Sequence, residues 1–293
     1  MQTNTEQETF YMYFADQNRE KSVIKNFLPK LFNLNPLYDS ITKYWTCEYN
    51  PKVEEYLQTL NFVDKQNEGY LVYPRDFDKA YTRLLDTIES TLNKIHPDRK
   101  PFPFEGPLHT TSLPNLKGIF KQRQLLSRKS AKNQGLLRVD AADPNVIDKT
   151  SNNIIERIRF YFYPMTPANY RALQGNRYHQ PVILVFDTKI MKNPAAVFST
   201  MNASKIRTRF LHIDKASSME WKYILDRGRY NRNDGIDHTG YRCAELLLPN
   251  GVSIDWIRKI YFQNEADFAE ARDTLGDQFD DIKCVVSPER FAI

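Results

Sequence analysis

One segment in the first third of the chain repeats its hydrophobic residues at helical spacing. The positions lie three or four residues apart and are Phe77, Tyr81, Leu84, Leu85, Ile88, Leu92 and Ile95. An α-helix brings such positions to one face, so the pattern predicts an amphipathic helix that begins near Asp76. A shorter helix is predicted over residues 51–60, with Asn50 as its N-cap and Pro51 in its first turn. We therefore expect residues 1–104 to form a smaller, mainly helical N-terminal region.

The pattern changes after a proline-rich stretch, DRKPFPFEGP, at residues 98–107. Three prolines and a glycine stop helices, so we place a domain boundary between residues 104 and 105. Beyond it, short apolar runs predict strands at residues 160–163, 181–186, 244–248 and 259–262. Helices are expected at residues 116–120, 166–173 and 266–275, the last two ending at Gly175 and Gly276. Residues 105–293 are therefore predicted to form an α+β domain.

Composition places the chain among ordinary globular proteins. It is 41% hydrophobic and 26% charged, and no apolar run approaches the roughly 20 residues that a membrane helix requires. We see no secretory signal at the start, and three cysteines are too few for a disulfide framework. These features predict a cytoplasmic protein without a membrane partner.

Charge is distributed unevenly along the chain. Residues 1–106 hold 13 Lys and Arg against 16 Asp and Glu, whereas residues 107–293 hold 28 against 20. A basic domain suits a polyanion such as nucleic acid, although many soluble proteins are equally basic without such a partner.

Several motifs of nucleotide and metal enzymes are absent from the sequence. It contains no GxxxxGK phosphate loop, no GxGxxG turn, no HExxH or CxxC pair and no GxSxG elbow. We therefore expect no metal, and a reaction that needs pocket-shaping groups and a well-placed carboxylate remains open.

Four separated segments carry a family resemblance through their order. They are PLHTTSLPNLKGI from Pro107, FYFYPMTPANY from Phe160, VFSTMNASKIRTRF from Val197 and YRCAELLLP from Tyr241. Together they resemble the DarT family of NAD-dependent ADP-ribosyltransferase toxins, over about residues 105–293. The resemblance implies an ADP-ribosyltransferase-like split mixed sheet with flanking helices, and NAD as the co-substrate.

The resemblance also implies roles for individual residues. Glu245, in the apolar strand AELLL, matches the family's catalytic glutamate. An unpaired carboxylate is costly to bury, so this residue faces either solvent or a functional cleft. His109 and Thr111 match the family's His-x-Thr position, and their imidazole and hydroxyl can bind ribose hydroxyls. The other residues expected to bind NAD are Asn115, Tyr161 and Tyr170.

Other residues of these segments are assigned to nucleic acid or to the core. Asn202 lies in the STMNAS stretch beside Arg207 and Arg209, which are expected to meet phosphates of the acceptor. Core packing is expected of three aromatic residues, namely Phe160, Phe162 and Trp221.

The sequence departs from the family at one position. DNA-modifying members carry a catalytic arginine in an ERR-like run between the histidine and the aromatic strand, where this chain reads VIDKTSNN. Four nearby cations could replace it, namely Arg138, Lys149, Arg157 and Arg159, and the sequence selects none of them. The acceptor therefore stays open between a base in single-stranded DNA and one in messenger RNA, as in some related phage-defence toxins.

Two alternatives also stay open: a protein-directed ADP-ribosyltransferase, and a catalytically inactive nucleic-acid-binding module. A toxin of this kind implies an antitoxin protein, with an accessory chaperone as a further candidate partner. The additional N-terminal region is a candidate contact surface for a partner or the substrate.

Overall fold

The computed structural model describes residues 9–14, 37–39, 44–48, 69–72, 74–95, 97, 102–148, 150–193, 195–230, 233–249, 251–279 and 281–292. The chain divides into two compact units, residues 1–80 and 81–293. The division falls within α4 (Pro74–Lys94), which confirms the long amphipathic helix predicted from Asp76. This division lies earlier in the chain than the boundary expected between residues 104 and 105, which stays a prediction.

The first unit contains an antiparallel sheet in the order β2-β3-β1-β4. Its strands are β1 (Thr9–Phe14), β2 (Leu37–Asp39), β3 (Tyr44–Glu48) and β4 (Gly69–Val72). The sequence analysis named no strand here, and the expectation of a mainly helical region stays a prediction. The aromatic runs TFYMYF and YWTCE have the composition that favours strands. The shorter helix expected at residues 51–60 lies outside the described residues.

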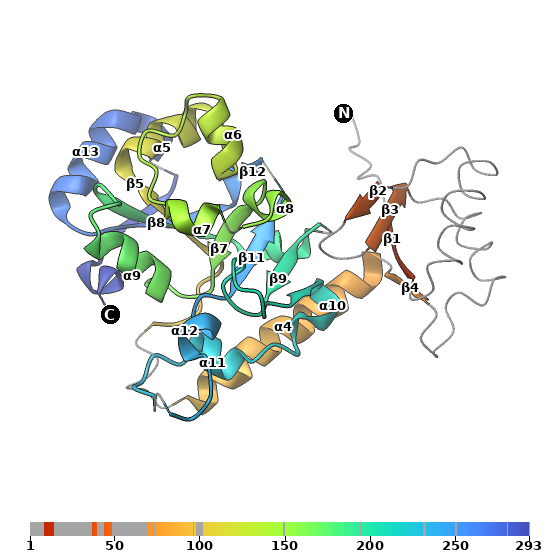
Figure 1. Cartoon of the computed structure of the whole chain (residues 1–293). Coiled ribbons are helices and arrows are strands. Elements are labelled where there is room, and N and C mark those ends of the chain that lie inside the picture. The colour runs from red at the N-terminus through yellow and green to blue at the C-terminus, as the bar shows by residue number, and fades with distance from the viewer. Residues whose placement is uncertain are drawn as a thin grey trace. The chain divides into compact units, whose positions relative to one another are not determined.

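The second unit holds an eight-stranded mixed sheet in the order β10-β9-β11-β7-β5-β8-β13-β14 (Figure 1). Its strands are β5 (Leu108–Ser112), β7 (Ile158–Tyr161), β8 (Pro181–Phe186), β9 (Val197–Ser199), β10 (Phe210–Leu211), β11 (Glu245–Leu248), β13 (Ile257–Phe262) and β14 (Lys283–Val286). Neighbouring strands are antiparallel except β13 and β14, which are parallel. This arrangement confirms the predicted α+β class with a mixed sheet.

The middle of the sheet is buried on both faces. All six residues of β8 and all four of β11 are buried, and a continuous apolar run is typical of a strand covered on both sides. The four strands predicted from the apolar runs correspond to β7, β8, β11 and β13. The sequence analysis did not name β5, β9, β10 or β14. Strands β9 and β10 have only three and two residues, and the residues of β14 are partly buried or exposed and give a weaker signal.

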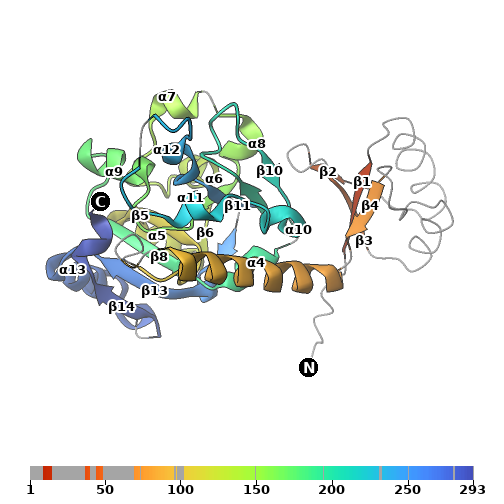
Figure 2. The ribbon, with the colours of Figure 1, turned by 90° about the horizontal axis from the view of Figure 1, so that it is seen from below.

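Helices cover the sheet and meet it through aromatic side chains. They are α5 (Leu113–Lys121), α6 (Arg128–Asn133), α7 (Pro144–Ile147), α8 (Asn152–Ile155), α9 (Pro167–Gln174), α10 (Ile213–Ala216), α11 (Trp221–Leu225), α12 (His238–Tyr241) and α13 (Glu265–Leu275). Helix α13 packs beside α5 and β14 at one end of the sheet (Figures 1 and 2). Phe162 stacks on Phe198 and meets Trp221 edge-on, with ring centroids 6.2 Å and 4.9 Å away. The expected core role of Phe160, Phe162 and Trp221 is confirmed, since each is at most 3% exposed.

Shorter elements complete the unit. Strands β6 (Gln124–Leu125) and β12 (Val252–Ser253) form a two-stranded sheet. The 3₁₀ helices are η3 (Thr188–Lys192), η4 (Ile254–Trp256), η5 (Gly276–Phe279) and η6 (Pro288–Phe291). Among the residues described, no helix has the length and apolar character needed to cross a membrane.

The proline-rich segment is anchored to the second unit just before β5. Glu105 accepts a hydrogen bond from the Tyr261 hydroxyl at 2.5 Å and pairs with Lys259 and Arg290. Gly106 follows with φ +136°, where a Cβ atom would lie 2.1 Å from the carbonyl oxygen of Phe186. Glycine is therefore required for the close approach that leads the chain into β5 beside β8.

Candidate active site

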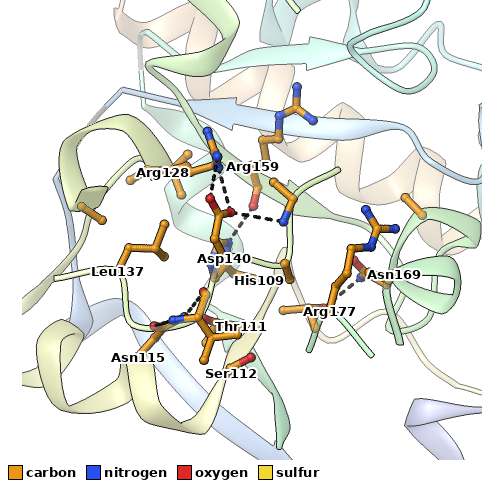
Figure 3. A pocket seen from close by; sticks show the side chains of 18 of the residues that line it. His109, Thr111, Ser112, Asn115, Arg128, Leu137, Asp140, Arg159, Asn169 and Arg177 are labelled. Atoms are coloured by element: carbon orange, nitrogen blue, oxygen red, sulfur yellow. Dashed lines mark hydrogen bonds and ion pairs between the residues drawn. The ribbon is translucent and has the colours of Figure 1, made fainter. Parts of the chain in front are cut away.

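A cavity of about 480 Å³ lies where β5 and β7 diverge. Strand β5 pairs with β8 at five positions, but it pairs with β7 only through Leu108 and Tyr161. The sheet is therefore split between its two central strands, four strands on each side. The cavity lining comes from β5, α5, β7, α9, the segment before α7 and the turn after β9 (Figure 3).

His109 lies at the split and is held in one tautomer. Its Nδ1 atom is 2.9 Å from the carbonyl oxygen of Arg159. Because a carbonyl only accepts, Nδ1 carries the proton and donates. Burial lowers the pKa of His109 below 6.5, and the hydrogen bond to Arg159 opposes this effect only in part. The neutral ring thus keeps an unprotonated Nε2, which can accept a hydrogen bond from a ligand.

The side chain of Asn115 shapes the wall of the cavity. Its Nδ2 donates to Thr111 Oγ1 at 3.1 Å and to the Val139 carbonyl at 2.9 Å. Its Oδ1 accepts from the backbone N–H groups of Arg138 and Val139 at 2.8 and 3.0 Å. All four hydrogen-bonding positions of the amide are occupied by protein groups. Asn115 therefore fixes residues 138–139 against β5, and Thr111 keeps its hydroxyl proton for another partner.

Two ion pairs hold the segment that follows Val139. Arg128 donates twice to Asp140, from Nε at 2.8 Å and from Nη2 at 2.5 Å. Arg177 pairs with Asp143 at 3.2 Å. All four residues line the cavity, and Figure 3 shows Arg128 and Asp140 joined across one side of it. Paired charges thus form part of the cavity lining.

Glu245 is a fully buried carboxylate beside this cavity. It lies opposite Tyr161 and Ser199 in the sheet and is 0% exposed. Its Oε2 accepts from the backbone N–H of Ala203 at 2.9 Å, and its Oε1 lies 3.5 Å from Nη1 of Arg159. Oε1 has no hydrogen-bond partner. Glu245 is not itself among the lining residues, but its neighbours line the cavity, including Arg159, Tyr161, Asn202 and Cys243. The carboxylate thus faces the interior next to the cavity and has unused acceptor capacity.

Comparison with known proteins identifies the family of the chain. The sequence profile of the family described as "ssDNA thymidine ADP-ribosyltransferase, DarT" matches residues 108–292. The chain belongs to the DarT family. Membership confirms the predicted resemblance and the class of enzyme, an ADP-ribosyltransferase that uses NAD. No curated protein sequence matches the chain.

Solved DarT structures share the fold at low sequence identity. DarT from Thermus sp. 2.9 in complex with ADP-ribosylated ssDNA is 18% identical, with a TM-score of 0.55, over 66% of this chain and 100% of that one. The NAD+ complex of the same protein is 17% identical, with a TM-score of 0.52, over 65% of this chain and 100% of that one. Thermosipho africanus DarTG in complex with ADP-ribose is 19% identical, with a TM-score of 0.53, over 64% of this chain and 51% of that one.

The two tyrosines expected to bind NAD in this DarT-family chain lie in different places. Tyr161 lines the cavity, and burial together with the charge of Glu245 raises the pKa of its hydroxyl well above 10.0. Tyr161 is therefore a neutral phenol. Tyr170 is outside the lining and packs against the core cluster that contains Leu108 and Met165. Tyr161 lies in strand β7 beside the cavity, whereas Tyr170 lies in helix α9 and packs against the core cluster.

The three residues expected to bind nucleic acid are also separated. Asn202 lines the cavity, and its Oδ1 accepts from the backbone N–H and the hydroxyl of Ser204 at 3.0 and 2.5 Å. Arg207 and Arg209 are exposed on the connection between β9 and β10 and are not part of the lining. The arginines therefore lie on the outer surface of the loop whose Ala203 holds Glu245.

Sequence reasoning missed the paired charges in the cavity lining. Arg128 and Asp140 lie 12 residues apart, and Asp143 and Arg177 lie 34 apart, without any periodic signal. Cavity-lining Asn169 was missed as well. Its Nδ2 donates to Thr110 Oγ1 at 2.9 Å, and its Oδ1 accepts from the Tyr178 hydroxyl at 3.1 Å. Within the described part of the chain, no group of three or more His, Cys, Asp or Glu could hold a metal ion.

Proposed function

We propose that the chain transfers ADP-ribose from NAD to a base of single-stranded DNA, with Glu245 as the catalytic carboxylate. One observation carries this assignment: a carboxylate with no solvent exposure and one unbonded oxygen lies beside a cavity with a neutral histidine. Unsatisfied buried polar groups are rare in folded proteins and call for an explanation. A hydroxyl of a bound ribose supplies one, because it can donate to Oε1.

The cavity suits the nicotinamide end of NAD. Its volume lies within the range of about 300–1,000 Å³ typical of small-molecule sites. In this proposal, the Nε2 of His109 accepts from a ribose hydroxyl and the hydroxyl of Thr111 donates to the nicotinamide ribose or amide. The phenol of Tyr161 offers a neutral face to the nicotinamide ring. Asn115 acts indirectly, because its amide holds the backbone of Val139 in the cavity wall.

The chemistry follows from charge development on the ribose. As the bond between C1′ and the nicotinamide nitrogen breaks, nicotinamide leaves with the electron pair and positive charge develops on the sugar. A carboxylate held at the 2′-hydroxyl stabilises that charge. A nitrogen of the acceptor base then forms the new bond to C1′ and loses its proton, which Glu245 or water accepts.

Single-stranded DNA is the acceptor that the relatives favour. The family description names thymidine in ssDNA, and a Thermus relative was solved with ADP-ribosylated ssDNA. The basic character of residues 107–293 and the exposed Arg207 and Arg209 fit a phosphodiester strand. Because the ERR-like run is missing, the base that accepts ADP-ribose has to be identified by experiment.

The decisive experiment offers labelled NAD to three acceptors in parallel: single-stranded DNA, single-stranded RNA and bulk protein. We expect label on the DNA, loss of that label in Glu245→Gln, and full activity in Glu220→Gln, which changes an exposed glutamate. Label on RNA alone or on protein alone would replace the proposed acceptor. Nucleic-acid binding without any NAD turnover would show an inactive module.

We also propose that the chain is the toxin of a toxin–antitoxin pair. An enzyme that modifies its host's DNA is harmful unless neutralised, and a DarTG protein is among the structural relatives. The N-terminal region, residues 1–104, is the proposed contact surface for the antitoxin or an accessory chaperone. Expression of the chain alone should arrest growth, and Glu245→Gln should relieve the arrest. Active enzyme that accumulates harmlessly without any neighbouring gene product would disprove this role.

A further inference from the structure

Four cations near the missing family arginine can be compared in the structure. Lys149 lies outside the described residues. Arg138 is not part of the cavity lining, and its backbone N–H is bound to Asn115. Arg157 lines the cavity, but its Nη1 donates to the Ala195 carbonyl at 2.6 Å. Arg159 both lines the cavity and forms an ion pair with Glu245.

We propose that Arg159 is the positioning residue for Glu245 in this chain. The inference rests on the proposed function and deepens it. It assigns the role to a strand residue, two positions before Tyr161, and not to the VIDKTSNN segment.

Strand register explains how the two charges meet. Arg159 lies opposite Leu247 and Tyr161 lies opposite Glu245 in the antiparallel pair of β7 and β11. Arg159 is therefore the diagonal neighbour of Glu245, and diagonal neighbours lie roughly 7–8 Å apart at Cα, within reach of a long side chain. Neither residue can shift its position without a slip of the whole register.

Arg159 completes the support of the carboxylate. The backbone N–H of Ala203 holds Oε2 at 2.9 Å, and the guanidinium faces Oε1 at 3.5 Å. The carboxylate is wholly buried, whereas the Arg159 side chain is 27% exposed. A buried carboxylate without a partner is strongly unfavourable, so the guanidinium of Arg159 supports the Glu245 side chain and fixes its orientation. At 3.5 Å the pair leaves Oε1 able to accept a ribose hydroxyl.

The same residue also holds the histidine. The carbonyl of Arg159 accepts the Nδ1 proton of His109 at 2.9 Å (Figure 3). The backbone of Arg159 thus fixes the imidazole while its side chain fixes the carboxylate. One residue sets the spacing between the two groups proposed to bind the same ribose.

The test separates the charge of Arg159 from its bulk. Arg159→Ala should lower kcat on the order of 10²-fold, the loss expected when a reacting group is misplaced, with a much smaller change in the KM for NAD. Guanidinium ion, added far below unfolding concentrations, should restore part of the rate. Urea, which has a similar shape but no charge, should not. Arg123→Ala is the matched control, because this arginine and its partner Asp255 are about two-thirds exposed, at 66% and 68%.

A double variant tests whether Arg159 acts through Glu245. Adding Arg159→Ala to Glu245→Gln should cause no further loss, since the group being positioned is already gone. If Arg159→Ala does not fold, Arg159→Lys and Arg159→Gln decide: activity kept by lysine and lost in glutamine supports the role, and equal activities overturn it.

Other outcomes distinguish the inference from the proposed function. Wild-type rates in Arg159→Ala, or rescue by urea as well as by guanidinium, would overturn the role of Arg159 alone. A wild-type protein without Glu245-dependent transfer to any acceptor would overturn both.

Discussion

The imidazole of His109 bonds to the carbonyl of Arg159 across the gap where β5 and β7 part, at 2.9 Å. A backbone ladder would normally satisfy that carbonyl. Here a side chain does so, and the strands are free to separate and form the cavity. The bond also fixes the ring with its proton on Nδ1, which decides what His109 can offer a ligand.

Replacing His109 with asparagine should separate its two roles. The amide nitrogen of asparagine can stand near Nδ1 and donate to Arg159, but nothing replaces Nε2. We expect a folded protein whose kcat/KM for NAD falls about tenfold, the worth of one typical hydrogen bond. Steady-state kinetics measure the loss, with His179→Asn, at an exposed position, as the control. An unchanged kcat/KM would remove Nε2 from the site.

Acid should destabilise the protein partly through His109. Burial lowers its pKa in the folded state, so below 6.5 the unfolded chain gains a proton that the folded chain resists. This loss of stability should be absent above pH 6.5 and should grow as the pH falls below that value. Urea unfolding of wild type and His109→Asn between about pH 8 and pH 5 measures it. If the difference in unfolding free energy between wild type and His109→Asn stays constant over that pH range, the prediction is wrong.

Removing the Asn115 side chain should affect both stability and NAD binding. Asn115→Ala leaves the Val139 carbonyl and two backbone N–H groups without their partner, which costs about 1–3 kcal/mol for each buried group left unsatisfied. The KM for NAD should rise because residues 138–139 lose their anchor. Thermal unfolding and NAD kinetics test this, with exposed Asn145→Ala as the control. A stable variant with a normal KM would show that the wall does not depend on this amide.

The pair of Arg128 and Asp140 should act as one unit in NAD binding. Arg128→Gln and Asp140→Asn are each expected to raise the KM for NAD several-fold, and the double variant should resemble either single one. Lys129 and Glu156 form a more exposed pair, at 43% and 56%, and lie outside the cavity lining, so they provide the matched cycle. Additive losses in the first cycle would mean that the two residues act independently.

The two tyrosines should respond differently to truncation. Tyr161→Leu removes an aromatic face from the cavity and should raise the KM for NAD, since an aromatic pair is worth roughly 0.5–1.5 kcal/mol beyond its buried area. Tyr170→Leu should reduce the free energy of unfolding and leave the KM unchanged, because this ring packs on the core. Equal effects on the KM would return Tyr170 to the NAD site.

Local pattern predicted the parts of the fold whose environment is uniform. Strands β8 and β11 could be recognised because burial on both faces leaves a continuous apolar run, and helix α13 because its residues end at a glycine cap, Gly276. Strands β1 to β4 were missed, since short aromatic runs do not distinguish a strand from other structure until a neighbour pairs with them.

The sequence by itself determined the family and the α+β class, because ordered motifs and apolar runs are local features. The catalytic role of Glu245 stays a prediction from the sequence. Only the tertiary structure decided which side chains share the cavity. It paired Arg159 with Glu245 and Arg128 with Asp140, and it packed Tyr170 against the core cluster. The physical reason is that strand register and the splitting of β5 from β7 bring together residues far apart in the chain, and neither leaves a periodic trace in the sequence.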